Sequence, residues 1–160
     1  MGFLRFYIVS FLWHCSLKKS MQPEAKFYKE LKKNIPSIIW NRVENLSLLG
    51  MPDLLGYNKK QCFFTVELKV VKGNKIKFSP HQIAWHKTHP QNTFIMAKTL
   101  DPCTLKTSSI SLFHGSSIMA LARYGMKVDA CACGFPACAS MFDEVGLTLE
   151  NLGAWALARY

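Results

Sequence analysis

The fold is decided by one stretch of sequence, residues 61–71, which reads QCFFTVELKVV. Apolar side chains recur at alternate positions, and this period of two is typical of a β-strand. Glu67 and Lys69 both fall in the other half of the alternation, so they project next to each other from one face. The stretch therefore predicts a strand that presents an acid and a base side by side.

The segments on either side of this strand predict further helices and strands, separated by proline, glycine and other turn-forming residues. The order of these elements predicts an α/β fold with a mixed central β-sheet flanked by helices. The expected helices are residues 23–34, 80–89, 116–124 and 142–157, and the other expected strands are residues 37–44, 54–57, 93–97 and 109–114.

Length and composition fit one packed domain and indicate an anionic partner. The chain has 160 residues, of which 49% are hydrophobic and 19% charged, so it is neither disordered nor collagen-like. Twenty basic residues against ten acidic ones leave a net charge of +10. Residues 21–127 hold sixteen of the basic and six of the acidic residues, so we expect a polyanion to meet the middle of the chain.

The two ends differ in composition from this middle segment. Residues 1–20 form an apolar leader of uncertain status, and residues 128–160 form an extension rich in alanine and cysteine. We expect one domain at residues 21–127 between them. No apolar run reaches the length of a membrane helix, so we expect a cytoplasmic protein of a microbe or a phage-infected cell, without a membrane partner.

The cysteines carry no recognisable site. The chain has six of them without a paired framework, and a chain of this length does not need disulfides, so a reducing, intracellular setting is expected. Cys131, Cys133 and Cys138 cluster near the C-terminus but lack the CxxC spacing that is typical of a zinc site. We expect no zinc there.

Asp53 adds a second carboxylate to the predicted strand pair. It follows the turn at residues 50–52 and begins the short strand 54–57. If this strand and strand 61–71 form a hairpin, Asp53 and Glu67 converge at one end of the sheet. Two carboxylates held close together repel each other unless a cation lies between them, and a hard divalent ion meets that need. Lys69 beside them supplies a positive charge for a phosphate or an attacking water.

These residues, in this order, resemble the PD-(D/E)XK nuclease signature. The longer pattern of GMPDL at 50–54, ELK at 67–69 and SPHQIAW at 79–85 is similar to the VRR-type branch of that superfamily. Junction-resolving nucleases of phages belong to the same superfamily. The resemblance covers about residues 22–127 and implies a restriction-endonuclease-like core.

The resemblance also implies roles for particular residues. Asp53, Glu67 and the main-chain carbonyl of Leu68 would bind Mg²⁺ or Mn²⁺, and Lys69 would orient the hydrolytic water or stabilise charge at the phosphate. Glu24 matches the additional acidic residue on the first helix. One further match completes the set: Gln82 corresponds to the glutamine that follows the core motif in this branch.

Each of these residues also has a plainer interpretation. Asp53 after a proline is a common turn residue, and Glu67 with Lys69 is a pattern that also occurs on a solvated strand face. Ser79 and Gln82 have the spacing of a helix capping box, which alone accounts for the glutamine.

The additional acidic residue has two candidates. Glu24 stands in the first turn of a predicted helix, where the helix dipole favours an acidic residue in any case. Glu44 ends a predicted strand near the turn at residues 50–52 and is a rival for the same role.

Basic residues after the core motif are candidates for contacts with the DNA backbone, which give affinity without sequence readout. His81, His86 and His89 predict a surface helix rich in histidine and lysine beside that face. No helix-turn-helix, zinc finger or RNA-binding aromatic signature is present, so we expect recognition of DNA structure over sequence. The candidate lysines are Lys72, Lys75, Lys77, Lys87 and Lys98.

The leading hypothesis is a Mg²⁺-dependent deoxyribonuclease, expected to be a structure-selective endonuclease that acts on branched or recombination intermediates without a small-molecule cofactor. An alternative is a non-catalytic, basic DNA-binding module of the same fold. A third is a small membrane-associated protein that uses residues 1–20. Endonuclease or exonuclease action, and a homodimer, remain open at this point.

Overall fold

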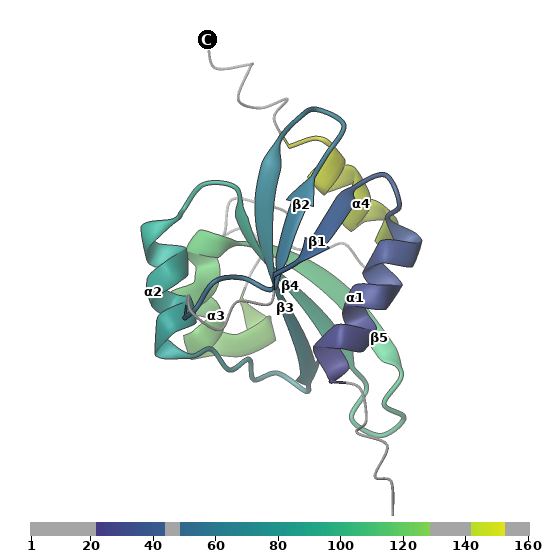
Figure 1. The fold of residues 1–160 in the computed structure, drawn as a ribbon. Coiled ribbons are helices and arrows are strands. Elements are labelled where there is room, and N and C mark those ends of the chain that lie inside the picture. Colours follow the sequence, from purple (N-terminus) through teal and green to yellow (C-terminus); the bar gives the residue numbers. More distant parts are fainter. Residues whose placement is uncertain (1–21, 44–48, 129–141, 153–160) are drawn as a thin grey trace, which may run out of the picture.

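The computed structural model describes residues 22–43, 49–128 and 142–152, and they form an α/β fold (Figure 1). Each expected helix and strand is present, with bounds that differ by a few residues at some ends. The leader at 1–20, Glu44 and the cluster of three cysteines fall outside these described residues. The elements in chain order are α1 (Pro23–Asn34), β1 (Ile39–Arg42), β2 (Leu54–Tyr57), β3 (Phe63–Lys72), α2 (Pro80–Thr88), β4 (Thr93–Leu100), β5 (Thr107–His114), η1 (Gly115–Ser117), α3 (Ile118–Tyr124), η2 (Gly125–Lys127) and α4 (Phe142–Glu150).

The strands form one five-stranded sheet in the order β1-β2-β3-β4-β5. β1, β2 and β3 are antiparallel neighbours, as are β4 and β5. β3 and β4 run parallel, which requires a crossover, and α2 makes it. The expected mixed central sheet flanked by helices is therefore confirmed.

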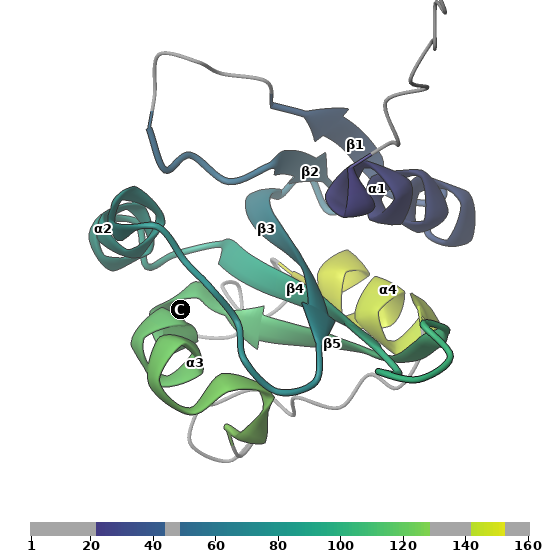
Figure 2. The same ribbon diagram turned by 90° about the horizontal axis from the view of Figure 1, so that it is seen from below.

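Helices cover both faces of the sheet (Figure 2). α1 and α4 lie on one face, where they pack against apolar side chains of β3 such as Phe64, Val66 and Leu68. α2 and α3 lie on the other face, where Ile118 and Leu121 pack with apolar residues of β3, β4 and β5. The sheet thus separates two apolar cores, and Glu67 and Lys69 belong to the face of α2 and α3.

α4 completes the core on the α1 face. Val145 and Leu149 are fully buried there beside Phe27 and Leu31 of α1. The expected helix at 142–157 begins at Phe142 as predicted, but it ends at Glu150, and residues 151 and 152 form a turn. The core on this face therefore draws on segments from both ends of the described chain.

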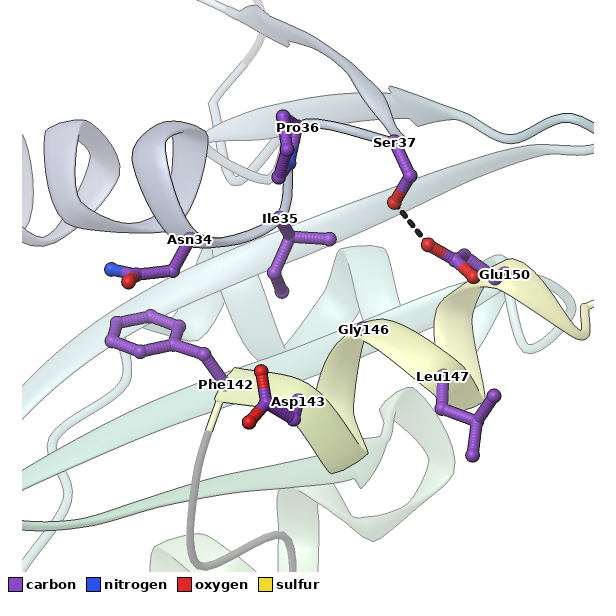
Figure 3. Close-up of a pocket in the computed structure, with 9 residues that line it drawn as sticks. All are labelled: Asn34, Ile35, Pro36, Ser37, Phe142, Asp143, Gly146, Leu147 and Glu150. Carbon is purple, nitrogen blue, oxygen red and sulfur yellow. Dashed lines mark hydrogen bonds between the residues drawn. The ribbon is translucent and has the colours of Figure 1, made fainter.

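The end of α1 and the side of α4 line an open cavity of about 370 Å³ (Figure 3). Ser37 donates a hydrogen bond to the carboxylate of Glu150 across it. Ile35 lies opposite Gly146, where a Cβ on the glycine would come within 3.3 Å of the isoleucine side chain. This cavity lies on the face of the sheet away from Glu67, so it is separate from the candidate site.

None of the helices in residues 22–43, 49–128 and 142–152 is both long enough and apolar enough to cross a lipid bilayer.

Candidate nuclease site

Glu67 is buried although it is a charged residue in the middle of a strand. It is 1% exposed, because α2 covers the face of β3 from which it projects. Lys69, two residues further on the same face, keeps 18% of its side chain exposed. The interpretation of this pair as a solvated strand face is therefore wrong for Glu67.

The pairing of β2 with β3 brings Asp53 beside this pair. Leu54 lies opposite Val66 in the antiparallel register, so Asp53 stands just beyond the end of the ladder, level with Glu67. Its carboxylate accepts a hydrogen bond from the main-chain N–H of Leu68 at 2.8 Å. The two strands form the expected hairpin, and it brings the carboxylates of Asp53 and Glu67 together.

The turn before Asp53 is held against the start of α2. Gly50 has a φ of +86°, which favours glycine, and a Cβ there would lie 2.3 Å from the carbonyl oxygen of His81. Only glycine permits this approach without a shift of the backbone. The turn therefore keeps Asp53 next to the first turn of α2.

Gln82 links α2 to the pair on β3. Its side-chain amide donates to a Glu67 carboxylate oxygen and accepts from the Lys69 ammonium at 3.2 Å. Lys69 also pairs with the same Glu67 oxygen at 2.9 Å. The three side chains thus form a closed network in which each orients the other two.

The capping interpretation of Gln82 is correct as well. The side chain of Ser79 accepts from the main-chain N–H of Gln82 at 3.2 Å, and the Gln82 side chain accepts from the Ser79 N–H at 3.0 Å. Both halves of the capping box are therefore present. One glutamine both begins the helix and holds Glu67 and Lys69.

Burial raises the pKa of both carboxyl groups. Burial raises the pKa of Asp53, against the opposing effects of the Leu68 N–H and of Lys69. Burial, and then the charge of Asp53, raise the pKa of Glu67 to about 7, although Lys69 acts in the opposite direction. A pair in this state gains from a cation that neutralises both groups.

Two further charged residues act on the pair from α1 and β1. Glu24 on α1 raises the pKa of both Asp53 and Glu67 through its charge, so the structure brings this candidate into the field of the site. Arg42 at the end of β1 lowers the pKa of Asp53. The sequence alone does not identify Arg42, because its place beside Asp53 follows from the pairing of β1 with β2, which no local pattern marks.

The donors present fit a hard divalent ion. One Glu67 oxygen, Oε2, is buried and has no hydrogen-bond partner among the described residues. The Leu68 carbonyl lies on the Asp53 side of β3, because the N–H and C=O of a strand residue point the same way. No group of three His, Cys, Asp or Glu side chains in the described ranges could hold a metal ion. Water molecules would therefore fill the remaining coordination positions of an ion bound by these oxygens, as is usual for Mg²⁺.

Four of the five lysines proposed for DNA contact lie on the surface. The fifth, Lys98, was predicted wrongly: it is 8% exposed and forms an ion pair with Glu30 on the α1 face, because β4 continues to Leu100 and carries Lys98 into the core region. The exposed lysines are Lys72, Lys75, Lys77 and Lys87.

His86 is also a correction to the sequence analysis. His81 on α2 and His89 just after it are exposed, but His86 is fully buried, so the prediction of a surface helix is correct for only part of this segment. Burial, together with the charge of Lys69, lowers the pKa of His86 to about 4. The imidazole is therefore neutral, and Gly115 lies so close to it that a Cβ would come within 2.7 Å of Nδ1.

No protein-family model matches the sequence. No curated protein matches it either. The structure is similar to that of Hjc, a Holliday junction resolvase from the archaeon Archaeoglobus fulgidus, with a TM-score of 0.42 and 18% sequence identity over 58% of this chain and 74% of that one. A likeness this distant carries no functional weight, so the function is inferred from the geometry of the site.

Proposed function

We propose that the protein is a divalent-metal-dependent nuclease that hydrolyses phosphodiester bonds of DNA. The observation that carries this proposal is the buried carboxylate of Glu67, with one free oxygen, beside Asp53 and tied to Lys69. A buried carboxylate with an unsatisfied oxygen and a second carboxylate nearby costs stability and serves no packing purpose. An arrangement of this kind is expected where a function requires it.

The side chains divide the work of the proposed reaction. Asp53, Glu67 and the Leu68 carbonyl would hold Mg²⁺ or Mn²⁺, which when bound lowers the pKa of a water and neutralises charge on the phosphate. Lys69, partly exposed at the mouth of the site, would bind a phosphate oxygen or orient the attacking water. Gln82 would keep Glu67 and Lys69 in place through its two hydrogen bonds.

DNA is the proposed substrate because the chain has a net charge of +10, and because exposed lysines lie at the end of β3, in the segment after it and on α2. Lys72, Lys75, Lys77 and Lys87 would contact phosphates, which gives affinity without sequence readout. Branched or recombination intermediates fit a protein with this kind of contact and fit the resemblance to the PD-(D/E)XK superfamily. A homodimer, with two sites for two strands, is part of this proposal.

The proposed nuclease domain is residues 21–127, with residues 1–20 and 128–160 as additions. The packing of α4 against α1 means that one part of the C-terminal addition contributes to the core of that domain. The acidic site and the exposed lysines of this proposal both lie within residues 21–127.

A non-catalytic DNA-binding module is the second candidate. One observation favours it: among the described residues, no three His, Cys, Asp or Glu side chains are grouped closely enough to hold a metal ion. A module of this kind has no need for the buried Glu67, whereas a nuclease does. The two candidates therefore differ in whether the acidic pair affects DNA cleavage.

The test is cleavage of a labelled four-way junction and a matched linear duplex, with Mg²⁺ or with EDTA. We expect Mg²⁺-dependent cutting, faster on the junction, that is lost in both Asp53→Ala and Glu67→Ala. Binding of both substrates without any cutting, unchanged by either substitution, would support the binding module instead.

A further inference from the structure

A groove of about 330 Å³ lies on the face of the sheet that carries the candidate site. Thr65 and Phe63, which line it, precede Glu67 on β3 at steps of two residues, so all three belong to one face of the strand. Trp85 and His89 line its other side, and they follow Gln82 by three and seven residues on one side of α2. The groove and the site therefore share one strand face and one helix face.

The groove has aromatic side chains on both of its walls. Phe63 is 60% exposed and its ring lies 4.5 Å from that of Tyr57. Trp85 and His89 stack on each other, with ring centroids 4.0 Å apart and an angle of 18° between the rings. Polar groups are present as well, since Asn92 also lines the groove. A flat, aromatic ligand with polar edges fits such a surface.

We propose that this groove binds an unpaired nucleobase of the DNA substrate. This inference rests on the proposed function and adds to it the class of substrate. Phe63 lies about 13 Å from Glu67 along the strand, at about 3.3 Å a residue. At about 3.4 Å for each stacked nucleotide, the bound base lies within a few nucleotides of the cleaved bond.

The groove selects unpaired bases because a base inside a duplex is already stacked and paired. A base at a branch, a flap or a single-stranded end is free to stack on Phe63 or on the Trp85–His89 pair. Stacking of this kind accepts every base, since all have an aromatic face. The groove thus gives a physical reason for a preference for branched DNA that needs no sequence readout.

A second copy of the chain is the competing occupant of an exposed aromatic surface. Two features favour the nucleobase. The groove lies on the strand face and the helix face that carry Glu67 and Gln82, and the chain has a net charge of +10. A strand of nucleic acid satisfies the aromatic walls and the positive charge together, whereas a copy of this basic chain repels that charge.

The experiment measures binding in a Glu67→Gln background, which removes cutting from the readout. The probe is a single-stranded oligonucleotide that contains 2-aminopurine, compared with a fully paired duplex of the same length. We expect Phe63→Leu to weaken single-strand binding about tenfold and to abolish most of the fluorescence change, with duplex binding unchanged. Tyr124→Leu, at a residue of α3 that is 55% exposed, is the matched control and should leave both affinities unchanged.

The outcomes separate this inference from the proposed function. Unchanged single-strand binding in Phe63→Leu, while the wild-type protein cuts junctions, would overturn the inference alone. Weakened single-strand binding, in a protein that never cuts DNA, would support the groove and overturn the nuclease. Sedimentation of the same variants tests the competing occupant: a wild-type dimer that Phe63→Leu converts to a monomer, with no change in DNA binding, would overturn the nucleobase proposal.

Discussion

The carboxylate of Glu67 is held in an environment that disfavours its charge. Burial and the charge of Asp53 raise its pKa from the usual range to about 7, so the carboxylate binds a proton more tightly in the folded protein than in the unfolded chain. The stability that proton binding to Glu67 contributes to the folded state is therefore largest below about pH 4.5 and is lost as the pH rises to 7. His86, whose pKa is lowered to about 4, acts in the opposite direction, so the two effects oppose each other in the wild-type protein.

A comparison with Glu67→Gln isolates the effect of Glu67 from that of His86. In EDTA, we expect the two proteins to be about equally stable near pH 4.5. Above pH 7 we expect the variant to have a free energy of unfolding about 3 kcal/mol higher, because it carries no buried charge. Urea denaturation across this range measures the difference, and a constant difference at every pH would contradict the account.

Gln82 combines two roles that a pair of substitutions can separate. Ser79→Ala removes the hydroxyl that caps α2 but leaves the contacts of Gln82 with Glu67 and Lys69 in place. Gln82→Ala removes these contacts and the other half of the capping box, in which the Gln82 side chain accepts from the Ser79 N–H. We expect each variant to lose about 1 kcal/mol of stability through the cap.

Only Gln82→Ala should also slow the cleavage of DNA, since only this variant frees Glu67 and Lys69 from their common partner. Melting temperatures and single-turnover rates of the two variants provide the comparison. Equal cleavage rates in both would show that Gln82 acts as a cap alone.

At the scale of elements, α4 belongs to the core, although its sequence is distant from the rest of that core. Leu149 is fully buried against the α1 face, whereas Leu147 on the same helix is 62% exposed. We expect Leu149→Ala to lower the free energy of unfolding by about 3 kcal/mol, because it leaves a cavity. Leu147→Ala is the matched control and should change it by less than about 0.5 kcal/mol. Equal, small effects in chemical denaturation would mean that α4 does not contribute to the fold.

The bounds of the elements show which signals the sequence carries. α1 and β2 match their predicted bounds, because a proline start and a regular apolar pattern mark them locally. β4 extends three residues beyond the predicted end at Ala97, since it is buried on both faces and shows no alternation. Lys98 resembles a surface residue in the sequence, and its burial is explained by its ion pair with Glu30 and its contact with the ring of Phe27.

The candidate site was predictable because local sequence patterns mark the strands that carry it. The alternation in β3 and the turn before β2 place Asp53, Glu67 and Lys69 together once the two strands pair. Arg42 and the burial of His86 depend on contacts between distant segments, and no local pattern encodes them. The packing of α4 against α1 is a third feature of this kind.

At the scale of the whole molecule, the positive charge is expected to govern DNA affinity. Neutralisation of four exposed lysines near the site should lower the slope of log affinity against log salt by about 3 to 4, at about 0.9 for each lost phosphate contact. The same number of exposed lysines on α1 is the control and should change the slope much less. The first set is Lys72, Lys75, Lys77 and Lys87, and the control set is Lys26, Lys29, Lys32 and Lys33.

Fluorescence anisotropy of a labelled junction at several salt concentrations gives both slopes. Equal changes in the two sets would mean that the net charge, and not the face beside the site, determines binding.

The most direct test of the whole account is the single-turnover rate at which Glu67→Gln cuts a four-way junction in saturating Mg²⁺. This substitution keeps the shape and the hydrogen-bond acceptor of the side chain but removes its charge. We predict at least a hundredfold slower cutting with unchanged junction binding. Asp143→Asn, at an exposed carboxylate in the first turn of α4, should cut at the wild-type rate. Cutting by Glu67→Gln at the wild-type rate would contradict the account.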